Sequence, residues 1–391
     1  MRDSTSSNTT VKPTKPYPDF PLYAHASGRW AKKIRQKLYY FGPWRDPRAA
    51  LELYLDQRDD LYAGRTPRSL QDSSLLLGEL CARYLLAKTA LVENGELSRR
   101  TLRNYTKTCD SMVEFFGPRR VVHEMRPSDF GPFRISLSRG RGPVTLGNTI
   151  QKIRSVFKWA YDEGLIDNPV RFGGFKKPST RTVRKEQARF GRRDFSADQV
   201  QSFLSHAPDQ LKAMILLGVN CGFGQTDCSS LVMDAVDLER GWHTFGRPKT
   251  GIPRRCPLWP ETIEALRDVI SRRGDAKSTE DADCVFLTKY GQRWVRVYEK
   301  GTHDDAVAKE FKKLQQQCDL VRARVGFYSL RRTFETVGGN CRDQVAVDFL
   351  MGHAPGANDM AAVYRQDISD DRLLGVTNHI HAWLHAEPAS K

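Results

Sequence analysis

Long apolar runs are missing from this 391-residue sequence, and none approaches the roughly 20 residues needed to cross a bilayer. The polar start MRDSTSSNTT also lacks the apolar core of a secretory signal. Acidic residues are too few to balance the basic ones, since 46 Asp and Glu face 62 Lys and Arg, for a net charge of +16. We therefore expect a cytoplasmic protein with no membrane partner. The charge favours nucleic acid as a partner, with a merely basic soluble protein as the alternative.

Closely spaced cysteine pairs are missing as well. The eight cysteines are scattered, and none forms a C-x-x-C pair, so zinc ribbons and redox motifs lose their main support. Scattered thiols suit a reducing cytoplasm. His379, His381 and His385 invite a metal interpretation, but no Glu completes a zincin motif, and an amphipathic terminal helix explains them equally well. We predict no metal and no cofactor.

The chain is too long for one ordinary core, and its composition divides it into five parts. A Ser-, Thr-, Lys- and Pro-rich tail is predicted to be disordered. A small basic sheet with one helix follows, then a helical region, a basic linker, and a mixed domain of helices and short strands. These parts span residues 1–16, 17–66, 73–178, 179–194 and 195–391. The sequence thus predicts a mainly α protein with small β-sheets.

The small sheet alternates aromatic and basic residues. Its second strand is expected over residues 29–41, and the helix after it should begin at Asp46-Pro47 and stop at Gly64. Such a basic ribbon can enter a DNA groove. The alternative is a solvated hairpin that only packs on its neighbour. The basic side chains of the second strand are Lys32, Lys33, Arg35 and Lys37.

The helical region carries apolar residues at helical spacing, and Ser98 is predicted to cap one of its helices. In its last helix, Ile150, Ile153, Phe157 and Tyr161 should form one apolar face. The other face and the adjoining linker present basic residues suited to phosphates. A four-helix interaction module with a solvated basic face is the alternative. These basic residues are Lys152, Arg154, Lys158, Lys176 and Lys177.

The last part of the chain carries the residues with the clearest chemistry. A capping box of Ser196 and Gln199 marks its start. Lys249 should lie at the head of a hairpin, because short strands bracket it. Further on come Arg331, then His353 after Met351-Gly352, and then Tyr364.

These residue types are the parts needed to cut a phosphodiester with a side-chain hydroxyl. A nucleophile must lie in line, cations must hold the non-bridging oxygens, and an acid must protonate the leaving 5′-oxygen. Tyrosine has a reference pKa of about 10, so clustered positive charge must help it to ionise. Each residue taken alone could equally be structural, and the prediction depends on their joint order.

The order resembles the C-terminal box of the tyrosine recombinases, the phage-integrase family, and the resemblance extends over residues 17–385. It implies an arm-type DNA-binding module, a core-binding domain and a catalytic domain. It assigns Tyr364 as the nucleophile, Arg331 as an oxygen clamp, His353 as a donor to phosphate and Lys249 as the general acid. It further implies a 3′-phosphotyrosyl intermediate on double-stranded DNA and a homotetramer on paired sites. The resemblance also implies an accessory DNA-bending protein and association with a bacterial nucleoid.

The sequence departs from the family pattern at two positions. Gly224 stands where the family has its first catalytic arginine, although Asp227 keeps the acidic position of that box. Tyr328 stands where the family more often has histidine or lysine. Loss of such a cation typically costs roughly 100- to 1,000-fold in rate. We hypothesise that a neighbouring arginine compensates, the candidates being Arg247, Arg254 and Arg255.

Three functions therefore compete. The first is a site-specific recombinase or integrase. The second is a DNA-binding protein that keeps the architecture but has lost strand cleavage, an alternative that Gly224 favours. The third is a type IB topoisomerase-like enzyme, which shares the chemistry but works as a monomer.

Overall fold

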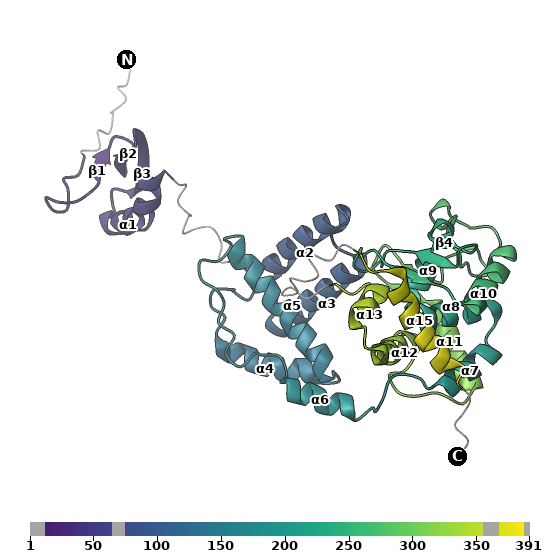
Figure 1. Cartoon of the computed structure of the whole chain (residues 1–391). Coiled ribbons are helices and arrows are strands. Elements are labelled where there is room, and N and C mark those ends of the chain that lie inside the picture. The colour runs from purple at the N-terminus through teal and green to yellow at the C-terminus, as the bar shows by residue number, and fades with distance from the viewer. Residues whose placement is uncertain (1–11, 65–74, 355–366, 387–391) are drawn as a thin grey trace. The chain divides into compact units, whose positions relative to one another are not determined.

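The computed structural model describes residues 12–64, 75–354 and 367–386, so the expected disordered tail lies mostly outside them. The chain forms two compact units, residues 1–76 and 77–391. It is mostly helical, with small antiparallel sheets, as the sequence predicted (Figure 1). Among the described residues, no helix has the length and apolar character that a membrane crossing requires.

The first unit is a three-stranded antiparallel sheet covered by one helix. Trp30 and Phe41 from the sheet and Tyr54 from the helix are buried against each other. Asp46 caps the helix by accepting a hydrogen bond from the Ala49 amide at 3.0 Å, which confirms the predicted start. The elements are β1 (Tyr23–His25), β2 (Arg29–Ile34), β3 (Lys37–Pro43) and α1 (Pro47–Ala63).

The expectation of one long strand over residues 29–41 is wrong. A two-residue turn at Arg35 and Gln36 divides it, and both residues have positive φ (48° and 67°). Such turns are usually marked by Asn or Gly, and the basic and aromatic pattern here runs through the turn without either. The turn exposes Lys33 and Lys37, whereas Lys32 lies over the ring of Tyr54.

The second unit begins with a group of helices in which α2, α3 and α5 pack together (Figure 1). Ser98 caps α3 as predicted, accepting from the Thr101 amide at 3.2 Å. On α5 the expected apolar face is buried except for Tyr161, which is 45% exposed. The basic linker contains a helix, α6, which Ser179 caps. The elements are α2 (Leu77–Glu93), α3 (Arg99–Phe116), α4 (Pro127–Ser138), α5 (Pro143–Asp162) and α6 (Thr180–Ala188).

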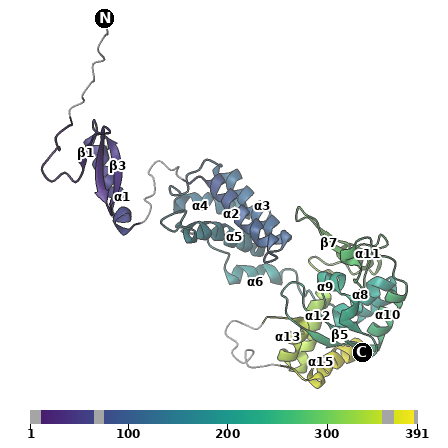
Figure 2. The same cartoon turned by 90° about the horizontal axis from the view of Figure 1, so that it is seen from above.

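The remainder of the second unit is built around α8, which packs against α7, α10, α11, α12 and α15. Figure 2 shows α12, α13 and α15 gathered together, away from α10 and α11. The Ser196–Gln199 capping box is present, which confirms the predicted start of α7. The helices are α7 (Ala197–His206), α8 (Asp209–Asn220), α9 (Gln225–Ser230), α10 (Pro260–Ser271), α11 (Ala306–Gln317), α12 (Tyr328–Gly338), α13 (Gln344–Met351) and α15 (Asp370–Leu384).

Two small sheets accompany these helices. In the first, β5 is the central strand and pairs with both β4 and β6. The strands are β4 (Val236–Asp237), β5 (Trp242–Thr244), β6 (Arg255–Pro257), β7 (Val295–Val297) and β8 (His303–Asp305), and the 3₁₀ turns are Met233–Ala235, Thr279–Asp281 and Gly339–Cys341.

A fully buried asparagine joins α8 to this sheet and to α10. The Asn220 side chain donates to the Pro257 carbonyl at 3.0 Å, and its Oδ1 accepts from the Trp259 amide at 2.9 Å and from the Thr262 hydroxyl at 3.0 Å. These bonds satisfy polar groups in the protein interior, where water cannot replace them. Asn220 therefore fixes where the next residues, Cys221 and Gly222, leave the helix.

Replacing Asn220 tests this joint. We expect Asn220→Ala to lower the free energy of unfolding by about 3–5 kcal/mol, because it removes the acceptor of the buried Trp259 amide and Thr262 hydroxyl and the amide donor to the Pro257 carbonyl. Thr262→Val removes only one of the three bonds and should cost about 1 kcal/mol. Urea unfolding followed by tryptophan fluorescence measures both. Equal effects of the two variants would contradict the role given to Asn220.

Candidate active site

Arg331, the predicted oxygen clamp, lies on the buried face of α12 and is only 1% exposed. Its Nη1 donates to the Gly222 carbonyl and its Nη2 to the Met351 carbonyl, both at 2.6 Å. Its Nε has no hydrogen-bond partner among the described residues. Burial, and then the nearby charge of Arg247, lowers the pKa of Arg331 to about 10, so the group stays charged at neutral pH. In this structure Arg331 ties two turns together.

The turn that contains Gly222 leads into residues 222–228, the stretch where the resemblance to the family predicts its first arginine and the sequence has Gly224. Asp227 Oδ2 accepts from the Gly224 amide at 2.7 Å, and Oδ1 accepts from Arg254 Nη2, also at 2.7 Å. The Arg254 side chain is fully buried and lies 4.2 Å from the centre of the Phe223 ring. The guanidinium of the residue just before β6 thus pairs with the acidic residue of a box that has no arginine of its own.

The two departures from the family pattern are in contact with each other. A β-carbon on Gly224 would lie 3.3 Å from the Tyr328 ring and 3.2 Å from Asp227 Oδ2, both tighter than ordinary contacts. The Tyr328 ring therefore occupies space close to that which a side chain at position 224 would enter. A side chain at position 224 therefore requires the Tyr328 ring, which is 43% exposed, to shift by a few tenths of an ångström.

The turn after α13 brings Arg247 into the same cluster. Gly352 ends that helix with φ of 59°, and a β-carbon there would lie 3.1 Å from the Arg247 β-carbon and 3.5 Å from Arg254 Cδ. Arg247 Nη1 also donates to the Gly352 carbonyl at 3.4 Å. Arg247 is half-buried, whereas Arg254 and Arg331 are buried. Of these three arginines, Arg247 is the one that solvent reaches.

His353 follows directly and is held by carboxylates. Its Nδ1 lies 3.1 Å from Asp348 Oδ1 and 3.9 Å from Glu335 Oε2. Its amide donates to the Asp348 carbonyl at 2.9 Å. These contacts fix the ring and leave Nε2 as the nitrogen available to an outside ligand. Sequence reasoning missed Asp348 and Glu335, although Asp348 lies one helical turn before the histidine.

The other flanking residues lie further out. Lys249 is exposed in the β5–β6 hairpin turn, as predicted, and makes no hydrogen bond or ion pair with another described residue. Arg255, the first residue of β6, pairs with Asp370 at 2.5 Å, and its guanidinium lies over the Trp242 ring at 4.0 Å. Of the three hypothesised compensating arginines, the structure therefore brings Arg247 and Arg254 into the cluster and leaves Arg255 out. Tyr364, the predicted nucleophile, lies outside the described residues.

The basic residues predicted to bind DNA are mostly exposed but differ in their contacts. Lys158 pairs with Asp162 at 2.7 Å, and the Arg154 guanidinium lies over the Phe172 ring at 4.7 Å. Burial lowers the pKa of Lys152. Lys177 bonds to Gln151, and Lys176 is exposed. Their role in DNA binding stays a prediction.

Comparison with solved structures identifies the fold. The chain is similar to a lambda integrase dimer bound to a COC′ core site, at 17% identity over 91% of this chain and 97% of that one, with a TM-score of 0.53. It is also similar to the Tn1549 transposon integrase in complex with a circular intermediate DNA, at 16% identity over 76% of this chain and 98% of that one, with a TM-score of 0.56. A lambda integrase tetramer bound to a Holliday junction matches at 16% identity over 88% of this chain and 98% of that one, with a TM-score of 0.52. The chain therefore has the fold of the DNA integrases.

The family follows from sequence. Residues 193–367 match the sequence model of the phage integrase family. They form a domain of that family, the tyrosine recombinases, as the motifs had predicted. No curated protein sequence matches the chain.

The buried pair of Asp227 and Arg254 gives a test of this geometry. We expect Asp227→Ala to destabilise the protein by about 3–5 kcal/mol, because it leaves the Arg254 charge buried without a partner. The matched control is Asp209→Ala, whose partner Arg272 is 66% exposed; such a surface pair contributes about 0–1 kcal/mol. Urea unfolding of both variants measures the difference. If the two losses are alike, Arg254 does not depend on Asp227.

Proposed function

We propose that this protein is a site-specific DNA recombinase or integrase that cuts and rejoins DNA through a 3′-phosphotyrosyl intermediate. The observation that supports this most is the convergence of Arg247, Arg331 and His353 on one turn. Arg331 bonds to the Met351 carbonyl, Arg247 lies against Gly352, and His353 comes next. The chain then runs on to Tyr364, so the candidate cations lie at the start of the segment that carries the nucleophile.

In the proposed reaction the Tyr364 hydroxyl oxygen attacks the scissile phosphorus and loses its proton to solvent. The bond from phosphorus to the 5′-oxygen breaks, and Lys249 gives its proton to that oxygen. His353 Nε2 donates to a non-bridging oxygen, while Asp348 holds the ring from the Nδ1 side. Rejoining is the reverse, with a 5′-hydroxyl attacking the phosphotyrosine and Lys249 recovering a proton.

Arg247 is our candidate for the missing first arginine. A cation must reach the phosphate to stabilise its developing charge, and among the three clustered arginines only Arg247 is not fully buried. Arg254 contributes from behind, since it holds Asp227 and thereby the Gly224 turn. Arg331 contributes its charge at short range and holds the two turns in place.

The partners follow from the same proposal. The substrate is double-stranded DNA, and the active species is a homotetramer on paired sites, as in the lambda integrase tetramer on a Holliday junction. An accessory DNA-bending protein would bring distant sites together, and the protein would act in the bacterial cytoplasm at the nucleoid. The sheet with α1 would serve as an arm-type module, residues 73–178 as the core-binding domain and residues 195–391 as the catalytic domain.

The second candidate function is a DNA-binding protein derived from an integrase that no longer cleaves. Two observations favour it, namely the glycine at position 224 and the complete burial of Arg254 and Arg331. This candidate shares the DNA contacts but predicts no covalent intermediate.

Covalent trapping on DNA distinguishes the two. Duplexes are first selected for binding to the full chain and then nicked near each possible cleavage position, so that the cut fragment diffuses away. An active enzyme should yield a covalent protein–DNA band that Tyr364→Phe abolishes. Arg247→Ala should reduce the trapping rate by roughly 100- to 1,000-fold. Arg255→Ala should leave it unchanged, because Arg255 faces Asp370.

An arginine introduced at position 224 should be able to take over the role proposed for Arg247. If Arg247 supplies the missing cation, Gly224→Arg should add little to the wild-type rate but should restore part of the activity lost in Arg247→Ala. A large gain from Gly224→Arg alone would refute compensation by Arg247. If the selected DNA binds tightly and no wild-type band forms, the second candidate function replaces the first. Relaxation of any plasmid by a monomer would indicate a topoisomerase instead.

Salt dependence tests the basic turn of the first unit. Lys33 and Lys37 are exposed beside the β2–β3 turn, and each phosphate contact contributes about one unit to the slope of log affinity against log salt. We expect Lys33→Ala with Lys37→Ala to reduce that slope by about 2. The control is Arg48→Ala with Arg58→Ala on α1, where each arginine pairs with a neighbouring carboxylate. A slope unchanged by the lysine pair would show that this turn does not contact DNA.

A further inference from the structure

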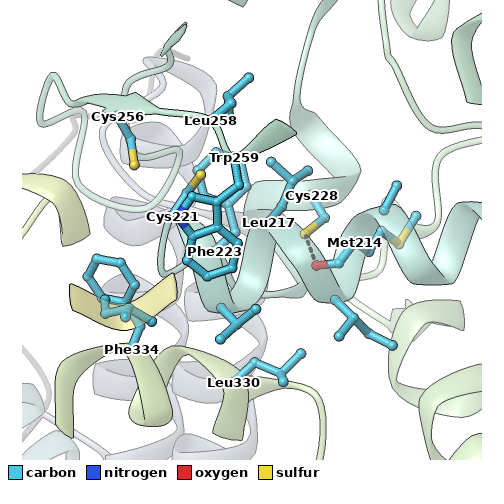
Figure 3. Close-up of a cluster of buried hydrophobic side chains, with 14 of the residues drawn as sticks. Met214, Leu217, Cys221, Phe223, Cys228, Cys256, Leu258, Trp259, Leu330 and Phe334 are labelled. Atoms are coloured by element: carbon cyan, nitrogen blue, oxygen red, sulfur yellow. Dashed lines mark hydrogen bonds between the residues drawn. The ribbon is translucent and has the colours of Figure 1, made fainter. Parts of the chain in front are cut away.

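Three side chains of types that bind metal ions, two thiols and an imidazole, meet in the core beneath the candidate active site. Cys221 follows the last residue of α8, His243 is the middle residue of β5, and Cys256 is its direct partner on β6. The two thiol sulfurs and a ring nitrogen all lie within 4.8 Å of one another. All three residues are buried, and Figure 3 shows Cys221 and Cys256 within the apolar cluster around Phe223.

The histidine is the unusual member of the group. His243 is 1% exposed, and neither ring nitrogen has a hydrogen-bond partner among the described residues. Buried polar groups are almost always paired, because each unpaired one costs free energy. The only ring beside it in the described part of the chain is that of Phe223, at 4.9 Å. Both nitrogens of this imidazole are therefore available to bind a metal ion.

Two other groups of ligand-type residues do not share this character. Glu261, His381 and His385 are partly exposed, and the His381 ring bonds to Glu261 at 3.0 Å. His353 is likewise bonded to Asp348. In both groups a carboxylate already satisfies the histidine. The core group has no carboxylate and offers sulfur, which selects thiophilic ions.

We propose that Cys221, His243 and Cys256 bind one zinc ion. Zinc takes sulfur at about 2.3 Å and histidine nitrogen at about 2.0–2.1 Å, so its ligand atoms lie roughly 3.4–3.8 Å apart. Because the three atoms lie within 4.8 Å of one another, the group needs to close by at most about 1 Å to reach that spacing. Both thiols lose their protons on binding, and the two thiolates neutralise the ion. The carbonyl of Asn220, 3.6 Å from the Cys256 sulfur, offers a fourth ligand.

The ion would join the segments that build the site. Cys221 precedes Gly222, whose carbonyl accepts from Arg331, and Cys256 comes two residues after Arg254. A bond through the metal would hold the end of α8 at a set distance from β5 and β6. The site is thus structural and independent of whether the protein cleaves DNA.

The test uses the full chain, stripped of metal with a chelator under reducing conditions and then given Zn²⁺ or Co²⁺. After desalting, the wild type should retain one equivalent of zinc by elemental analysis, and its thermal midpoint should rise. The cobalt form should show thiolate-to-metal charge transfer in the near ultraviolet. Cys256→Ala and His243→Leu should lose the bound metal, the absorption band and the rise in midpoint.

Cys228→Ala is the matched control. Cys228 is an equally buried thiol of the same core, but its sulfur donates to the Met214 carbonyl (Figure 3). This variant should keep the metal while losing a comparable buried group. A wild type that retains no zinc and gives no charge-transfer band overturns the proposal without recourse to any variant. Zinc kept by Cys256→Ala but lost by His381→Ala overturns it too, as does retention of Cu⁺ but not Zn²⁺.

Discussion

The guanidinium of Arg331 holds the carbonyls of Gly222 and Met351 in the protein interior, and the candidate site is arranged around this contact. One carbonyl belongs to the turn that leads from α8 to the acidic box, and the other ends the helix that leads to His353. Charge-assisted bonds are strong where water is excluded. Because one rigid, planar group makes both bonds, the two turns keep a set separation. A neutral side chain of the same size would leave two buried carbonyls unpaired.

Around this contact, the changes in the sequence are related by space and charge. The Tyr328 ring lies next to Gly224, so a side chain at position 224 would crowd it. Asp227, which has no arginine in its own box, pairs with Arg254, the residue just before β6. Arg247, Arg254 and Arg331 thus place three guanidinium groups around Asp227 and Gly352.

Burial decides what each cation can do. A buried guanidinium such as Arg254 shapes the site and its electrostatic field, but only a group that solvent reaches can touch a phosphate. Arg247 meets that condition, and its place against Gly352 puts it beside His353. The same argument separates the two candidate functions, because a DNA clamp needs exposed lysines and arginines along the backbone and no cation at a scissile phosphate. The shared integrase fold is compatible with both.

Local chemistry was readable from the sequence. The helix starts at Asp46, Ser98 and Ser196 were predictable because capping depends only on neighbouring residues. The order of the motifs around Arg331 and His353 indicated the family whose sequence model matches residues 193–367. Tertiary structure alone decided which residues meet. Cys256 faces His243 because β5 pairs with β6, and Arg254 pairs with Asp227 of α9 across 27 residues of sequence, so no local spacing links either pair. The burial that separates Arg254 from Arg247 depends in the same way on the packing of the whole domain.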